Sequence, residues 1–145
     1  MAKTASDGLS QEEREAVKNR AKELRDQAKA GKSREAGTKQ VREAIEKLDG
    51  TDRDIAEGLH KVVGEVAPDL MPKTYYGFPA YANAAGKVVV FTQPASKFKT
   101  RYATIQFDEN AHLDDGDFWS TGFAVLAWTP AVEKKITELV AAAVA

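Results

Sequence analysis

All twelve aromatic residues of this 145-residue chain lie between Tyr75 and Trp128, and the first 74 residues contain none. Aromatic side chains favour the pleated, half-buried surface of a β-sheet. The earlier part of the chain instead carries apolar residues at helical spacing, which is typical of amphipathic helices. This distribution predicts helices first and a sheet later.

The first predicted helix covers residues 11–30 and begins after a capping box formed by Ser10 and Glu13. Its apolar stripe is thin, because only two of its residues, Val17 and Leu24, are large and apolar. A helix that buries so little apolar area is marginal on its own. Residues 31–38 are predicted to be a linker.

The rest of the chain predicts one mixed domain. Three further helices are expected at 39–48, 52–66 and 130–144, and four strands at 74–83, 87–92, 102–107 and 121–128. The connections between strands are too short for crossover helices, so neighbouring strands must pair antiparallel. The predicted fold class is α+β, with a four-stranded or five-stranded antiparallel meander packed by helices from both ends of the chain. The predicted organisation is a charged helical arm with its linker at 1–37 and a single domain at 38–145.

The composition excludes several kinds of site. The chain has no cysteine, which rules out a disulfide framework, a thiolate nucleophile and a cysteine-based metal site. Its net charge of −1 gives no general attraction to nucleic acid, and no stretch approaches the roughly 20 apolar residues that span a bilayer. No nucleophile-elbow or phosphate-loop motif occurs. We therefore expect a non-enzymatic, cytoplasmic protein with no membrane or nucleic-acid partner.

The loop 108–117 is the first candidate binding site, because it concentrates carboxylates around one imidazole. Hard cations take oxygen ligands, and a histidine can join them around iron. The spacing matches no calcium-binding loop, and the alternative is a solvated connection whose aspartates cap local turns. The candidate metal ligands are Asp108, Glu109, His112, Asp114, Asp115 and Asp117.

An aromatic run together with a basic segment is the second candidate site. Lys97, Lys99 and Arg101 alternate along the chain, so an extended segment would place three cations on one face. Such a face can receive a phosphate, a carboxylate or an acidic partner, and aromatic rings can line a pocket beside it. The alternatives are a charged edge strand and an ordinary aromatic core. The candidate ligand residues are Tyr75, Tyr76, Phe78, Tyr81, Lys97, Lys99, Arg101 and Trp119.

His60 falls on the flank of the apolar stripe of the predicted helix 52–66. A lone histidine in such a position is more often a surface residue than a ligand. We therefore predict that His60 lies on the surface.

The segment 68–81, with the sequence PDLMPKTYYGFPAY, carries a resemblance to a known family. Together with the hydrophobic strand at 87–91 and the segment FKTRYATI at 98–105, it resembles the YdhG-like family of small bacterial domains of unknown function. The most specific part is YGFPAY, and the resemblance covers residues 38–144. The charged segment before Thr38 resembles an extension that some actinobacterial members carry.

This resemblance implies an α+β domain with a central antiparallel sheet, similar in general shape to frataxin. Some members are described as frataxin-like intracellular iron chaperones, which deliver iron to iron–sulfur or haem assembly through surface carboxylates. The resemblance thus implies iron as the bound metal and an iron-acceptor protein as a partner. The family pattern marks no ligand residue, and further acids on the predicted helices are Asp52, Asp54 and Glu57. The alternative function is a small-ligand or protein-partner binding module that uses the aromatic and basic residues.

Overall fold

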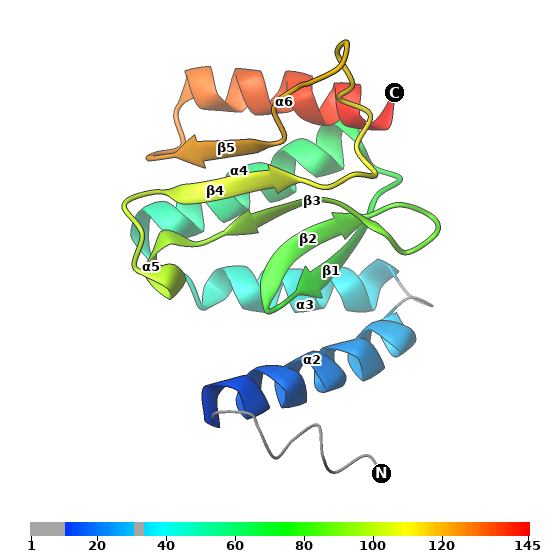
Figure 1. Cartoon of the computed structure of the whole chain (residues 1–145), viewed down its shortest axis with the longest axis vertical. Coiled ribbons are helices and arrows are strands. Elements are labelled where there is room, and N and C mark those ends of the chain that lie inside the picture. Colours follow the sequence, from blue (N-terminus) through cyan, green and yellow to red (C-terminus); the bar gives the residue numbers. More distant parts are fainter. Residues whose placement is uncertain (1–10, 31–33) are drawn as a thin grey trace.

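The computed structural model describes residues 11–30 and 34–145, without the side chains of 26–30. Figure 1 shows a sheet with helices at both ends of the chain. The helices are α2 (Gln11–Ala30), α3 (Arg34–Glu46), α4 (Gly50–Val66), α5 (Ala95–Phe98) and α6 (Pro130–Val144). The strands are β1 (Met71–Tyr75), β2 (Phe78–Ala82), β3 (Val88–Gln93), β4 (Ala103–Phe107) and β5 (Gly122–Val125).

The five strands form one sheet in the order β1-β2-β3-β4-β5, and every neighbouring pair is antiparallel. The predicted α+β class and meander topology are therefore confirmed, with five strands. The number is five because the segment predicted as one strand at 74–83 contains a tight turn that separates β1 from β2.

That turn consists of Tyr76 and Gly77, which connect the paired residues Tyr75 and Phe78. Both turn residues have a positive φ, 52° at Tyr76 and 82° at Gly77. Two positive φ angles are the requirement of the type I′ turn, whose twist matches the strands of a two-residue hairpin. Glycine adopts this conformation without penalty, whereas a tyrosine there is strained by about 1–2 kcal/mol.

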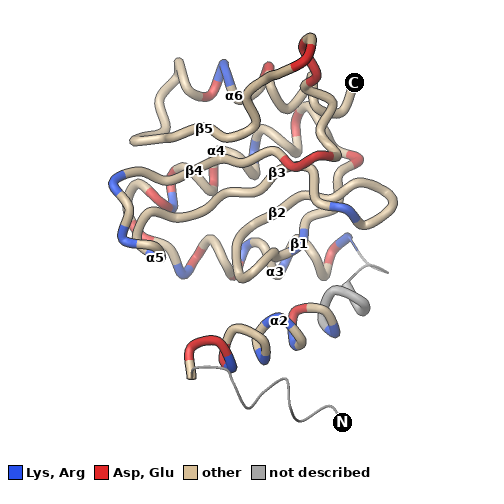
Figure 2. Tube along the Cα trace, viewed as in Figure 1, with Lys and Arg blue, Asp and Glu red and all other residues tan. Residues whose placement is uncertain are grey.

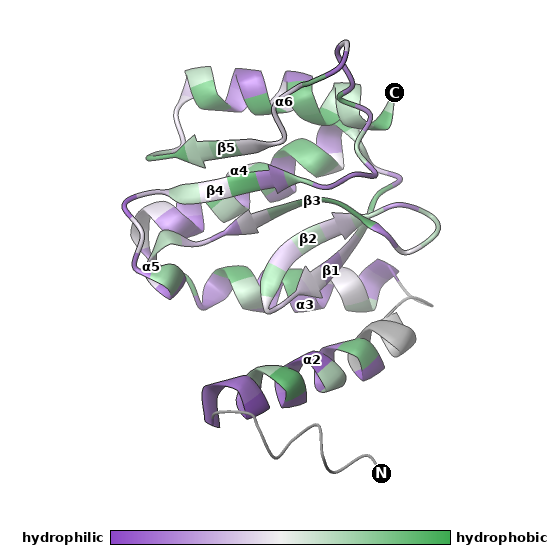
Figure 3. Ribbon diagram, viewed as in Figure 1, coloured by the Kyte–Doolittle hydropathy of each residue, from purple (hydrophilic) through white to green (hydrophobic). Residues whose placement is uncertain are grey.

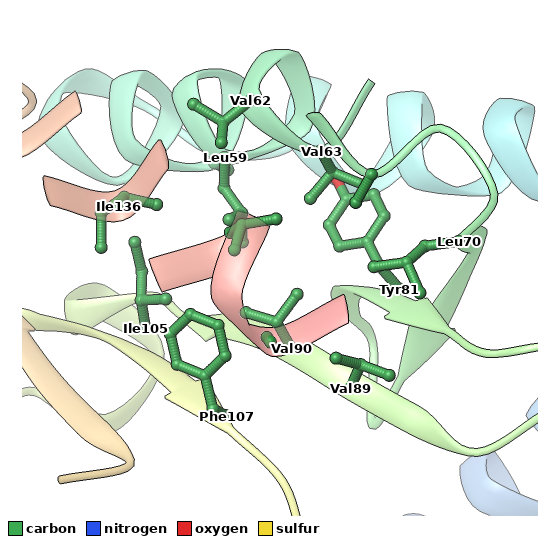
Figure 4. Close-up of a cluster of buried hydrophobic side chains, with 14 of the residues drawn as sticks. Leu59, Val62, Val63, Leu70, Tyr81, Val89, Val90, Ile105, Phe107 and Ile136 are labelled. Carbon is green, nitrogen blue, oxygen red and sulfur yellow. The ribbon is translucent and has the colours of Figure 1, made fainter. Parts of the chain in front are cut away.

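The main hydrophobic core lies between the sheet and the helices α3, α4 and α6, and Figure 4 shows part of it. The apolar stripe of α4, with Ile55, Leu59 and Val62, is buried as its spacing predicts. Large residues from the strands and from α6 fill the space opposite this stripe: Tyr81, Val90, Ile105, Phe107, Ile136 and Val140. The start of α6 also agrees with the sequence, because the Thr129 hydroxyl accepts a hydrogen bond from the Val132 N–H at 3.2 Å.

A second, smaller cluster lies on the other face of the sheet. Successive side chains of a strand point to opposite faces, so Phe78 and Ala80 of β2 point away from the core that contains Tyr81. With Val88 and Phe91 of β3 they form a buried cluster, against which Tyr75 packs. The aromatic residues near the hairpin therefore divide between the two faces of the sheet.

α3 begins earlier than predicted. Residues 34–38 belong to this helix and not to a linker, so the predicted boundary between residues 37 and 38 falls inside α3. The reason is tertiary packing: α3 lies against β1 so closely that a Cβ on Gly37 would overlap the carbonyl oxygen of Pro72. Ser10 of the predicted capping box and residues 31–33 lie outside the described residues.

Within the described ranges, no helix combines the length and the apolar character needed to cross a bilayer. Figure 3 shows green, hydrophobic turns between purple, hydrophilic ones on α4 and α6, and a hydrophilic start of α2.

Candidate functional site

A cavity of about 520 Å³ lies where α2 and α3 meet the turn of the β1–β2 hairpin and the start of α5. Four residues form its chemically distinctive part, and we call them the hairpin site: Tyr76, Gly77, Phe78 and Lys97. The residues that line the rest of the cavity are Asn19, Lys22, Glu23, Gln40, Glu43, Ala44, Lys47, Leu48, Thr74, Pro79, Pro94 and Ser96.

The hairpin site holds a carboxylate supplied by α2. The Gly77 N–H donates a hydrogen bond to Glu23 Oε2 at 3.0 Å. Lys97 stands beside this turn, with its Nζ 3.4 Å from the Tyr76 carbonyl oxygen, to which it donates, and 4.8 Å from the centroid of the Phe78 ring. A Cβ on Gly77 would lie 3.1 Å from Lys97 Nζ, so the absence of a side chain leaves room for the ammonium group.

A second residue of α2 reaches the same hairpin. The guanidinium carbon of Arg20 lies 4.9 Å from the centroid of the Tyr76 ring and 5.4 Å from that of Tyr75. The two rings themselves form an edge-to-face pair with centroids 4.7 Å apart. Cations over aromatic faces at these distances are attracted by the ring quadrupole. The hairpin thus contacts α2 through one charge-assisted hydrogen bond and through the cation–π contacts of Arg20 with two rings.

The structure brings together half of the predicted ligand pocket. Tyr75, Tyr76, Phe78 and Lys97 gather around the hairpin. Tyr81 does not join them, because it points to the core face and is fully buried there. Trp119 lies in the connection between β4 and β5 and is 38% exposed.

The segment with Lys97, Lys99 and Arg101 is not extended, so the condition for three cations on one face is not met. Residues 95–98 form the short helix α5, and Lys99 follows in a left-handed conformation with φ 54°. Lys99 and Arg101 therefore do not share one face with Lys97. The guanidinium carbon of Arg101 instead lies 5.3 Å from the ring centroid of Tyr102.

Asp52 of α4 holds α5 in place, since its carboxylate accepts the N–H groups of Ala95 and Ser96 at 2.8 and 3.1 Å. Burial raises the pKa of Asp52, but the hydrogen bonds from the Ser96 side chain and from these two N–H groups outweigh burial and leave the pKa below its ordinary value. This carboxylate has a structural task that explains why the segment is helical.

The acidic loop does not assemble a metal centre in the structure. Among the described residues, no three His, Asp or Glu side chains lie close enough together to hold an ion. Asp108 Oδ1 accepts the Glu109 N–H at 2.8 Å, a local turn contact of the kind that the alternative interpretation expects. His112 Nδ1 lies 3.1 Å from the Ala145 carbonyl oxygen, and the side chains of Glu109, Asp114, Asp115 and Asp117 are exposed.

Figure 2 shows acidic residues of this connection in two separate places, directly after β4 and at the loop tip away from α2. Of the helical acids, Glu57 is paired with Arg42 at 3.2 Å and lies 3.9 Å from Arg53. Iron binding by these carboxylates stays a prediction, and a calorimetric titration with Fe²⁺ on the intact chain and on an Asp114→Ala/Asp115→Ala variant tests it.

His60 is half-buried, which the sequence interpretation missed. Its Nδ1 lies 2.9 Å from the hydroxyl of the buried Tyr81. Burial and then the Arg42 guanidinium lower the pKa of His60, while the Glu57 carboxylate opposes them. Burial raises the pKa of the Tyr81 hydroxyl. We assign the hydroxyl as donor and Nδ1 as acceptor, because a neutral imidazole has one acceptor nitrogen and a buried hydroxyl needs an acceptor.

A signal for the burial of His60 was present in the sequence. Ala56 lies one turn before His60 on the same side of α4 and is fully buried. Counting alanine as part of the apolar stripe widens it far enough to include His60. The histidine also lines a second cavity of about 670 Å³, together with Arg42, Arg53, Asp54, Glu57, Gly58, Lys61, Trp128 and Glu133.

Most of the charged side chains around this second cavity form ion pairs with one another or lie close to an opposite charge. Glu57 pairs with Arg42, and Lys61 Nζ lies 3.5 Å from Glu133. Such mutual pairing leaves less charge for an external ligand than the hairpin site offers. We therefore place the candidate functional site at the hairpin.

Comparisons with protein-family models, with curated proteins and with solved structures found no match for this chain. The resemblance to the YdhG-like family consequently stays a prediction.

Proposed function

We propose that this chain is a non-catalytic binding module that captures a carboxylate group of an acidic partner protein at the hairpin site. The observation that carries the proposal is the hydrogen bond from the Gly77 N–H to the Glu23 carboxylate. A carboxylate supplied by the chain itself supports a carboxylate as the group that this turn accepts.

The turn has the chemistry of an anion site. β1 and β2 pair through residues 71–75 and 78–82, so the N–H of Gly77 lies outside the strand ladder and donates to the Glu23 carboxylate. Lys97 adds a positive charge beside it. Hydrogen bonds to an ionised acceptor contribute about 1.5–3 kcal/mol each, more than those between neutral groups. The Tyr76 and Phe78 rings supply apolar contact around the anion.

An experiment on the intact chain tests the proposal. The Glu23→Ala variant vacates the subsite, and N-acetyl-glutamate N-methylamide serves as the carboxylate probe. We expect the Gly77 amide resonance to shift as the probe is added, because its N–H gains an acceptor. Lys97→Gln in the same background should reduce the shift, and Lys99→Gln should not.

The neutral analogue N-acetyl-glutamine N-methylamide is the control for the charge of the probe. It should move the Gly77 resonance much less at the same concentration. An unresponsive Gly77 amide, or equal shifts with the charged and neutral probes, would contradict carboxylate capture at this turn.

A further inference from the structure

We propose that α2 is a displaceable internal ligand of the hairpin site, and that the groove it occupies accepts an acidic amphipathic helix of a partner protein. This inference rests on the proposed function, because it assigns the partner and the regulation of the same site.

α2 docks on the body through polar side chains. Arg20 and Glu23 face the hairpin, whereas the large apolar residues Val17 and Leu24 remain 58% and 53% exposed. A helix that belongs permanently to a core turns its apolar stripe inward, because burial of that stripe stabilises it. The orientation of α2 forgoes this contribution, so its attachment depends on a few polar contacts.

Several of the polar contacts beneath α2 are incomplete or unfavourable. Arg20 Nη1 and Gln40 Oε1 are buried without a hydrogen-bond partner, and Gln40 lines the cavity under the helix. A buried polar atom without a partner costs free energy. Arg20 also lies near Lys73, whose pKa is lowered first by burial and then by this guanidinium. A partner helix with a donor opposite Gln40 and no cation beside Lys73 would therefore fit the groove better than α2 does.

The charges of the groove select an acidic helix. When α2 is removed, the charged residues left in the lining are Lys47, Lys97 and Glu43, which gives a local charge of +1. The Gly77 N–H then lacks the acceptor that Glu23 provides. A glutamate or aspartate on the partner helix meets both requirements.

Attachment to the same chain lets so weak a contact persist. Because α2 is tethered, a partner displaces it only when the ratio of partner concentration to partner Kd exceeds the ratio of the effective concentration of α2 to its own Kd. Changing the contacts of the arm should consequently change the apparent affinity for any competing helix. A peptide with the sequence of α2 can serve as the competing helix in a measurement of this change in apparent affinity.

The experiment uses a synthetic peptide of residues 11–30, acetylated and amidated at its ends, with a fluorophore for anisotropy. The receptors are the intact chain and the arm-weakened chain, defined as the full-length Arg20→Ala/Glu23→Ala variant. We expect the peptide to bind the arm-weakened chain at least tenfold more tightly than the intact chain, because its own α2 no longer competes fully.

Two variant peptides test the role of the carboxylate. A Glu23→Ala peptide should bind the arm-weakened chain at least tenfold more weakly, which is the loss expected for one charge-assisted hydrogen bond. A Glu15→Ala peptide, which loses an exposed glutamate of the same helix, should bind like the parent peptide. Equal affinities for the intact and arm-weakened chains, or equal effects of the two substitutions, would overturn the inference.

The outcomes separate this inference from the proposed function. If the small carboxylate probe shifts the Gly77 resonance but the peptide does not bind, the hairpin site captures carboxylates and α2 is not a competing ligand. If the probe leaves Gly77 unchanged, the proposed function itself is wrong, whatever the peptide does.

Discussion

α4 and α2 are both long helices of this chain, but they are attached to it by different physical means. α4 packs an apolar stripe against the sheet and α6, where Ile55 and Leu59 are fully buried. α2 leaves Val17 and Leu24 exposed and reaches the hairpin with Arg20 and Glu23. Apolar burial contributes over the whole interface, whereas a few polar contacts can be replaced one at a time by those of another molecule. α4 therefore maintains the fold, whereas α2 can be exchanged for a helix of another molecule.

The largest expected effect comes from truncating matched leucines in the two helices. Leu59→Ala should lower the free energy of unfolding by about 2–5 kcal/mol, because it leaves a cavity in a fully buried position. Leu24→Ala should change it by less than about 0.5 kcal/mol, since that side chain is largely exposed. Urea denaturation of both variants measures the difference. Similar losses from the two substitutions would mean that α2 belongs to the cooperative core.

Two glycines of α4 provide a comparison inside one helix. A Cβ at Gly58 would overlap the indole of Trp128, whereas a Cβ at Gly64 would meet no atom within 4 Å. We expect Gly58→Ala to destabilise the protein by about 1–3 kcal/mol through overpacking. Gly64→Ala should stabilise it by about 0.5–1 kcal/mol through helix propensity. Thermal denaturation measures whether each variant is more or less stable than the parent protein. If both substitutions stabilised the protein, Trp128 would not pack tightly on α4.

The pair His60 and Tyr81 predicts a pH dependence of the core. Because the pKa of His60 is lowered in the folded protein, the unfolded chain binds more protons below the ordinary histidine pKa of about 6.5. The contribution of His60 to the free energy of unfolding should therefore be fully present above that pH and should decrease as the pH falls below it. The contribution of Asp52, whose pKa is also lowered from 3.8, is lost only at still lower pH.

Urea titrations at pH 7 and pH 5 measure this effect. The His60→Gln variant should lose the part of the pH dependence that belongs to His60, and His112→Gln, at an exposed histidine, serves as the control. If His60→Gln retained the full dependence between pH 7 and pH 5, the assignment of His60 as a neutral acceptor would be wrong.

The smallest expected effect is at the hairpin turn. Tyr76→Asn creates the Asn-Gly pair that type I′ turns prefer, and it should stabilise the body by about 0.5–1 kcal/mol. The same change removes the ring beneath Arg20, so α2 should become less protected in hydrogen exchange. A more stable body together with a less protected α2 would support a strained tyrosine whose role is to contact α2. An increase in both the stability of the body and the protection of α2 would contradict that role.

Much of the fold follows from local patterns. The stripe of α4, the Thr129–Pro130 start of α6 and the antiparallel meander depend on periodicity, capping and short connections, all of which are visible in sequence. α5 was missed because Asp52, 43 positions away, supplies its cap. The hairpin turn was missed because Tyr-Gly lacks the usual Asn-Gly signal.

The candidate site was less accessible to sequence reasoning. The sequence pattern groups Tyr75, Tyr76, Phe78 and Lys97 in one pocket. It does not distinguish the two faces of the sheet, so it also includes Tyr81, which lies on the core face. Glu23 and Arg20 were missed because periodicity identifies the apolar stripe of α2 but not which side of the helix contacts the body. That choice depends on a hairpin more than 50 residues away in the chain.

Hydrogen exchange under native conditions tests the central claim most directly, because it reports separately on the two helices. The account predicts that amides 17–24 of α2 exchange through a local opening of low free energy that is insensitive to low concentrations of urea. Amides 55–63 of α4 should exchange only through global unfolding. Glu23→Ala should accelerate exchange in α2 and leave α4 unchanged. Equally slow exchange in the two helices of the intact chain would contradict an exchangeable arm on a fixed body.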